Sequence, residues 1–145
     1  MTARQRAPRA AGYSGTPLPR KLGIGPGARV GLIAAPPGFD AVLGELPDGV
    51  VLRRALRGPL DVVVAFVAQR AELERRFGAL RGALAPSGGL WIAWPKRSSG
   101  VSSDLSETVV RSVGLAGGLV DNKVCAIDDT WSGLRFVYRL SDRPG

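Results

Sequence analysis

The segment DVVVAFV, residues Asp61–Val67, is the clearest indication of the fold class of this chain. Every residue after Asp61 is apolar, so we expect both faces of this strand to be buried, as in a parallel strand covered by helices. An amphipathic helix is predicted next, over Arg70–Leu84, and LWIAW at Leu90–Trp94 is the following buried strand. Between them, Pro86–Gly89 (PSGG) is predicted to be the turn that ends the helix.

The alternation of strand and helix continues on both sides of this unit. Outward from it, the chain is expected to form two earlier strands, a short helix between them, a helix beginning near Asp104, and two closely spaced final strands. The strands are predicted at Arg29–Ala35, Val50–Ala55, Val120–Ile127 and Leu134–Leu140. Connections this short predict a single three-layer Rossmann-like α/β sandwich, with a mostly parallel sheet and an antiparallel C-terminal strand pair.

Length and composition narrow the class of protein further. With 145 residues, 45% of them hydrophobic, the chain makes one domain over residues 13–145, preceded by a basic tail over residues 1–12 that we expect to be disordered. No apolar run suits a membrane span or a secretory signal, and the single cysteine, Cys125, fits a reducing compartment, so we expect a cytoplasmic protein. The absence of histidine excludes His-dependent nucleophiles and the usual zinc sites.

Two resemblances add to this prediction. Asp61–Leu140 resembles the second half of the class I methyltransferase fold, which also ends in an antiparallel strand pair. The stretches GYSGTPLPRKLGI, AFV…AELERRF, LAPSGGLWIAWPK and VDNKVCAIDDTWSGLRFVYR are similar to a family of small bacterial proteins known only as a domain of unknown function. That resemblance implies a Rossmann-like domain and assigns no activity.

The first strand-to-helix turn is where a doubly wound sheet binds its ligand. Here it reads AAPPGFD, and Pro36 and Pro37 remove two backbone donors. The second strand runs into arginines where an acidic residue normally holds a ribose. We therefore expect no adenosylmethionine or NAD binding of the usual kind, and predict no cofactor, no metal and no catalytic residue. The candidate cleft consists of Pro36, Gly38, Asp40 and Trp94.

The loop after the strand Leu90–Trp94 is the strongest candidate for anion binding. It carries two cations and several hydroxyls, and it is predicted to lead into a helix N-terminus at Asp104. The predicted anion-binding residues are Lys96, Arg97, Ser98, Ser99 and Ser102. The alternative is that serine and glycine simply form a loop, with Ser103 or Asp104 capping the helix.

Basic residues suggest a nucleic-acid hypothesis, since the net charge is +8. Its residues are Arg4, Arg6 and Arg9 in the tail, and Arg53, Arg54 and Arg57 after the second strand. A solvated tail and an arginine-rich composition explain the same residues. We expect Trp91 and Cys125 to be core residues, Trp94 to be available for stacking, and Asp128–Trp131 to form a hydrogen-bonded turn in preference to a magnesium site.

From the sequence we favour a non-catalytic binding or regulatory module that takes an anionic ligand at the Lys96–Asp104 loop. Two alternatives stay open: a divergent methyltransferase-type transferase, and weak sequence-independent nucleic-acid binding. The partner is an anionic small molecule, a nucleic acid or another protein, and no membrane is expected.

Overall fold

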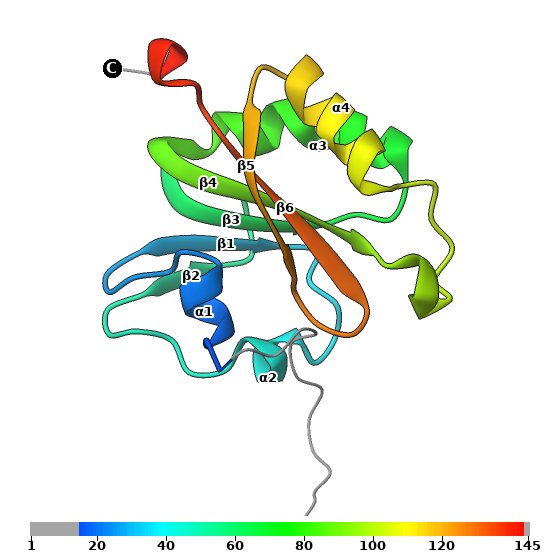
Figure 1. Ribbon diagram of the computed structural model, residues 1–145. Helices are drawn as coiled ribbons and strands as arrows, with labels where there is room; N and C mark the ends of the chain where they lie inside the picture. The colour runs from blue at the N-terminus through cyan, green and yellow to red at the C-terminus, as the bar shows by residue number, and fades with distance from the viewer. Residues whose placement is uncertain (1–14, 144–145) are drawn as a thin grey trace, which may run out of the picture.

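Six strands form one sheet in the order β2-β1-β3-β4-β6-β5 (Figure 1). The computed structural model describes residues 15–143, so the tail expected over residues 1–12 lies outside the described residues. Strands β1 to β4 are parallel, and β6 is antiparallel to both of its neighbours, β4 and β5. The strands are β1 (Arg29–Ile33), β2 (Val51–Arg53), β3 (Leu60–Phe66), β4 (Leu84–Pro95), β5 (Val120–Ala126) and β6 (Trp131–Val137).

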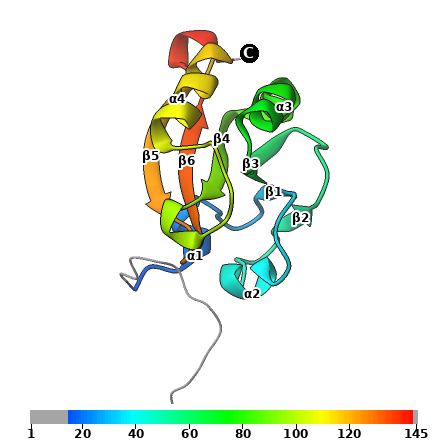
Figure 2. The same cartoon turned by 90° about the vertical axis from the view of Figure 1, so that its right-hand side faces the viewer.

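Helices lie on both faces of the sheet, which confirms the predicted three-layer α/β architecture (Figure 2). The short helices α1 (Leu18–Lys21) and α2 (Phe39–Leu43) pack on one face. The longer helices α3 (Arg70–Gly82) and α4 (Glu107–Ala116) pack on the other. Two short 3-10 helices, η1 (Arg97–Ser99) and η2 (Leu140–Asp142), follow β4 and β6.

Each face of the sheet has its own hydrophobic core, because successive side chains of a strand point to opposite faces. In β4, Trp91 belongs to the core under α1 and α2, whereas Trp94 belongs to the core under α3 and α4. Trp91 is fully buried, and its indole Nε1 donates a hydrogen bond of 3.0 Å to the carbonyl of Leu22. The prediction that Trp91 is a core residue is confirmed.

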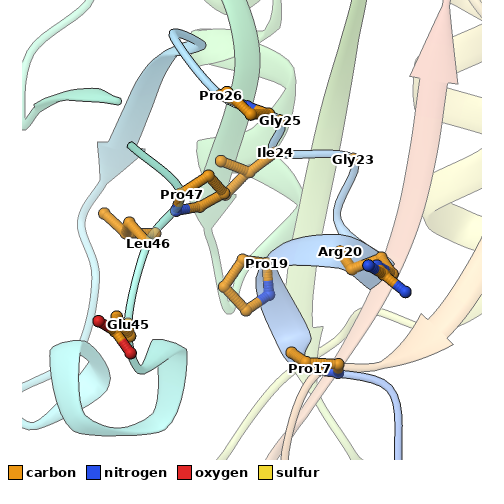
Figure 3. Close-up of a pocket in the computed structure, with 10 residues that line it drawn as sticks. All are labelled: Pro17, Pro19, Arg20, Gly23, Ile24, Gly25, Pro26, Glu45, Leu46 and Pro47. Atoms are coloured by element: carbon orange, nitrogen blue, oxygen red, sulfur yellow. The ribbon is translucent and has the colours of Figure 1, made fainter. Parts of the chain in front are cut away.

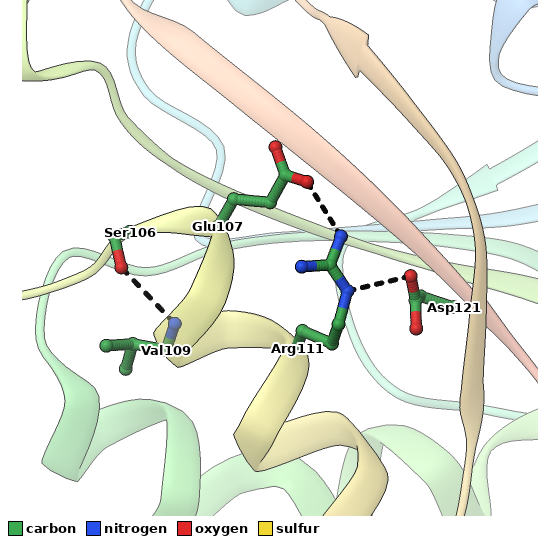
Figure 4. A network of polar contacts seen from close by, with 5 residues as sticks. All are labelled: Ser106, Glu107, Val109, Arg111 and Asp121. Carbon is green, nitrogen blue, oxygen red and sulfur yellow. Dashed lines mark hydrogen bonds and ion pairs between the residues drawn. The ribbon is translucent and has the colours of Figure 1, made fainter.

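Helix α4 lies close to the sheet and is also tied to it by charge. A Cβ atom on Gly114 would come within 2.0 Å of the Phe136 ring, so glycine is required for this approach. On the outer side, Arg111 donates to Glu107 at 2.7 Å and to Asp121 at 3.0 Å, which links α4 to β5 (Figure 4). These two carboxylates raise the pKa of Arg111.

Several predicted boundaries are wrong. Pro86–Gly89 does not form a turn; it lies within β4, next to an irregularity in the register with β3 between Leu60 and Val62. Helix α3 therefore ends at Gly82 instead of Leu84. The final strand is shifted, since β6 begins at Trp131 and pairs with β4 from Pro95 onward.

The helix predicted to begin near Asp104 begins at Glu107 instead. The hydroxyl of Ser106 accepts from the backbone N–H of Val109, which makes Ser106 its N-cap (Figure 4). Asp104 instead accepts the backbone N–H of Arg70, at 2.7 Å, and so caps the start of α3.

Candidate functional site

Two cavities of about 490 Å³ each border the turn between β1 and α2, at the carboxyl ends of the parallel strands. Both include Pro36–Phe39 in their walls. One extends to Arg54, just beyond β2, and is called here the β2-side cavity. The other extends to the turn between β5 and β6, at Asp128–Trp131, and is called the β6-side cavity. This edge is where open α/β sheets bind ligands.

The turn itself is built from unusual backbone conformations. Ala34 has a φ of 59°, in the left-handed region that residues other than glycine rarely adopt. Gly38 has a φ of 84°, and its missing side chain leaves open space at the mouth of both cavities. The carbonyl of Pro36 accepts the N–H of Phe39 at 3.1 Å, which closes the turn into α2. Of the predicted cleft residues, Pro36, Gly38 and Asp40 are therefore brought together.

Three aromatic rings form a continuous apolar contact beside this turn. Phe39 packs edge-on against Phe66, the last residue of β3, with ring centroids 4.9 Å apart. Phe66 packs edge-on against Trp131 at 5.0 Å. The predicted cleft of Pro36, Gly38, Asp40 and Trp94 does not include Trp131, because its partner Phe66 is distant in the chain and only the sheet order brings the two strands near.

Trp94 is a correction to the predicted cleft. Its side chain is 5% exposed and sits in the core under α3 and α4, so it has no free face for stacking on a base. The reason is the alternation along β4, which sends Trp94 to the face away from α2. Trp131, half-buried in the wall of the β6-side cavity, occupies the place that the sequence assigned to Trp94.

Asp40 and Arg54 form the charged part of the β2-side cavity. Arg54 Nη2 lies 2.8 Å and 2.9 Å from the two carboxylate oxygens of Asp40. Both side chains are well exposed, at 56% for Arg54 and 67% for Asp40, so the pair is solvated. A carboxylate from α2 is thus held at the end of β2, where the sequence itself supplies only arginines.

The turn between β5 and β6 holds two carboxylates with different surroundings. Asp128 is buried, and its Oδ1 accepts the backbone N–H groups of Thr130 and Trp131 at 2.8 Å and 2.9 Å. Asp129 is exposed and lines the β6-side cavity. The predicted hydrogen-bonded turn is confirmed, and within residues 15–143 no group of three or more potential metal ligands is found.

The loop predicted to bind an anion is held mainly by its own hydrogen bonds. The hydroxyl of Ser99 donates to the carbonyl of Lys96 at 2.6 Å, and Ser103 donates to the carbonyl of Ala68 at 2.6 Å. Arg97, Ser98 and Ser102 are exposed. Helix α4 starts at Glu107 with Ser106 as its N-cap, so Asp104 is not at the expected helix N-terminus. The anion site at Lys96–Ser102 stays a prediction.

The arginines of the nucleic-acid hypothesis differ in their surroundings. Arg54 is paired with Asp40, while Arg53 and Arg57 are exposed. Arg4, Arg6 and Arg9 lie outside the described residues. Cys125 is half-buried against the core under α1 and α2, and burial raises the pKa of its thiol, which opposes a role as a nucleophile.

A larger cavity, of about 620 Å³, lies beside α1 and the segment that precedes β1 (Figure 3). Its walls are mostly apolar and rich in proline, and Arg20 and Glu45 are its charged residues. It offers few converging polar groups, so we do not assign it as the site. No helix among residues 15–143 has the length and apolar character needed to cross a membrane.

The solved structures that resemble this chain include a methyltransferase and a protein with bound S-adenosyl-L-methionine. A SAM-dependent methyltransferase from Aquifex aeolicus matches with a TM-score of 0.58 and 16% identity, over 81% of this chain and 85% of that one. The fibrillarin pre-rRNA processing protein of Methanococcus jannaschii matches with a TM-score of 0.57 and 14% identity, over 88% and 70%. Fibrillarin from Aeropyrum pernix, solved with natively bound S-adenosyl-L-methionine, matches with a TM-score of 0.52 and 17% identity, over 87% and 70%.

The chain is a Rossmann-like α/β protein, and its sheet with the antiparallel C-terminal pair is that of the methyltransferase fold. Identities this low establish the fold alone. No protein-family model matches the chain, and no curated protein sequence matches it either, so the resemblance to a bacterial family of unassigned function stays a prediction.

Proposed function

We propose that this protein is a divergent methyltransferase-type transferase whose ligands bind at the turn between β1 and α2. The observation that carries the proposal is the methyltransferase fold together with two cavities at the carboxyl edge of its sheet. The structural likenesses favour this alternative over the non-catalytic module that the sequence favoured.

The methyltransferase fold implies S-adenosylmethionine as a ligand, and the residues at the turn between β1 and α2 determine whether it can bind. A ribose diol needs a carboxylate acceptor at the end of the second strand. Asp40 meets this need from α2, since Arg54 holds its carboxylate at that position while leaving it 67% exposed. Pro36 and Pro37 offer no N–H groups, so the remaining contacts differ from the usual glycine-rich turn. The residues present can therefore hold S-adenosylmethionine, but with Asp40 in α2, and not a residue of β2, as the ribose acceptor.

The residues around the turn between β1 and α2 would each contribute to the proposed reaction. When bound, S-adenosylmethionine supplies an electrophilic methyl group on a positively charged sulfur. Asp40 would accept hydrogen bonds from the ribose hydroxyls, and the ion pair with Arg54 orients its carboxylate. Trp131 and Phe39 supply an apolar wall that excludes water, and the electron-rich face of Trp131 suits a nearby cation. Exposed Asp129 is placed to hydrogen-bond a polar acceptor substrate in the β6-side cavity.

Calorimetric titration with S-adenosylhomocysteine, the demethylated product, tests the proposal. We expect saturable binding in the micromolar range and at least a tenfold weaker Kd for Asp40→Asn, since losing a charged acceptor costs about 1.5–3 kcal/mol. Asp48→Asn removes another exposed carboxylate, one that lines neither edge cavity, and is expected to bind as the unmodified protein does.

The outcomes separate the hypotheses. Absence of heat and of any thermal shift at millimolar S-adenosylhomocysteine would overturn the transferase and return the non-catalytic module to first place. Binding that Asp40→Asn leaves unchanged would keep the transferase and remove Asp40 from the ribose position.

A further inference from the structure

A third cavity, of about 330 Å³, lies at the opposite end of the sheet from the turn between β1 and α2. It is formed by the beginnings of β4 and β5, the end of β6 and the segment that leads into η2. Its polar lining includes Arg135, Arg139, Arg143, Ser87 and Asn122. Among its lining residues, all within the described part of the chain, there is no aspartate or glutamate. The cavity is therefore strongly positive.

Arg135 is the most constrained of these cations. Its guanidinium lies directly over Gly89, where a Cβ atom would come within 2.3 Å of Arg135 Nε. Among the residues that the structure describes, it donates to one other side chain, and that hydrogen bond is long, 3.4 Å from Nη1 to Asn122 Oδ1. Burial lowers the pKa of Arg135, and no carboxylate of residues 15–143 lies within ion-pair distance to offset that desolvation. Arg135 is half-buried, and a partly desolvated cation without a counter-ion is costly unless an anion joins it.

The surrounding charges reinforce this positive potential. Arg139 faces Asp142 at 3.9 Å, and both side chains are more than half exposed, so this pair neutralises little. Behind the cavity wall, the Arg81 guanidinium lies 5.3 Å from the centroid of the Tyr138 ring. Its Nε atom is buried and has no hydrogen-bond partner in the described part of the chain.

We propose that this cavity binds the phosphate group of a small phosphorylated molecule. The planar guanidinium of Arg135 presents paired N–H donors that match phosphate oxygens, and Arg139 and Arg143 complete the charge at the rim. Ser87 and Asn122 add neutral hydrogen-bonding groups. The volume admits a phosphate and a modest attached group. The site goes beyond the proposed transferase function, because it shares no residue with the carboxyl edge.

Inorganic phosphate and pyrophosphate are the probes for this site, titrated into the full chain against chloride at matched ionic strength. We expect saturable binding by calorimetry and a rise in Tm that follows the occupancy. Arg135→Gln should raise the Kd at least tenfold. Arg97→Gln removes the same charge from the loop after β4, where the sequence predicts an anion site, and should change the Kd less than twofold.

A second variant guards against a folding defect in Arg135→Gln. Arg139→Gln combined with Arg143→Gln alters only exposed side chains and should raise the Kd at least threefold. Equal stabilisation by chloride, or an unchanged Kd in Arg135→Gln, would overturn the proposal. A weakened Kd in Arg97→Gln alone would move the anion to the Lys96–Ser102 loop. Arg135-dependent binding of a short single-stranded RNA, with no binding of phosphate or pyrophosphate, would replace the small ligand with a nucleic acid.

Discussion

Arg29 and Asp61 illustrate how single residues join elements that are distant in the sequence. Arg29 opens β1 and Asp61 lies near the start of β3, and the guanidinium donates to both carboxylate oxygens at 3.1 Å. The backbone N–H of Arg29 adds a bond of 2.8 Å to the same carboxylate. These bonds, led by the side-chain bond from Arg29, lower the pKa of Asp61 from its ordinary value of 3.8.

This shift predicts a pH-dependent contribution of Asp61 to stability. A carboxylate with a lowered folded-state pKa stabilises the fold above its unfolded-state pKa and loses that effect as the pH falls through the folded-state value. Asp61→Asn should therefore unfold at lower urea concentration than the unmodified protein at pH 7. The difference should shrink as the pH drops below 3.8. A difference that persists unchanged at pH 2 would mean that the ion pair is not its cause.

Boundaries of elements show where neighbouring parts of the chain override local signals. Residues 103–107 read SDLSE and offer several capping side chains within one turn. Ser103 and Asp104 are both used by the segment around the start of α3, through Ala68 and Arg70. Ser106 is left to cap α4. The sequence predicted the helix correctly but not its first residue.

The Ser106 cap of α4 is expected to contribute to the stability of the protein. Ser106→Ala removes the side chain that accepts from Val109, so we expect a loss of about 1 kcal/mol in the free energy of unfolding. Ser112→Ala, at an exposed position of the same helix, should change it by less than about 0.5 kcal/mol. Urea denaturation measures both, and equal effects would argue against Ser106 as the cap.

Strand β6 connects the last strand pair to the parallel part of the sheet. It lies between β4 and β5, although β5 precedes it in the chain. It also carries Leu134 and Phe136, which are no more than 1% exposed in the core under α3 and α4. Without β6, β5 would have no neighbouring strand in the sheet.

Truncation tests this arrangement. A chain that ends after Thr130 should lose cooperative unfolding, because β5 and α4 would lose their partner strand and the large apolar side chains beneath them. A chain that ends after Arg139 retains β6 and should keep a cooperative transition, since Leu140 is 80% exposed. Urea transitions followed by circular dichroism distinguish the two. A cooperative transition in the shorter chain would contradict the central role of β6.

Local sequence patterns are sufficient to predict the α/β class, the parallel βαβ unit and the antiparallel final pair. These follow from local periodicity, since DVVVAFV and LWIAW are apolar on both faces and the helix between them is amphipathic. The turn Pro36–Asp40 was also visible, because proline and glycine restrict the backbone locally.

The contacts between side chains at the sites depend on how distant segments pack together. Asp40 is held at the end of β2 by its ion pair with Arg54. Phe66 contacts Trp131, although their strands are far apart in the chain. Trp94 is not part of the predicted cleft, because its position in β4 points its side chain to the other face of the sheet. Arg135 and Arg139 join Ser87 in one cavity only because β6 pairs with β4. Such contacts depend on sheet order and on the direction of each side chain, which local sequence patterns do not encode.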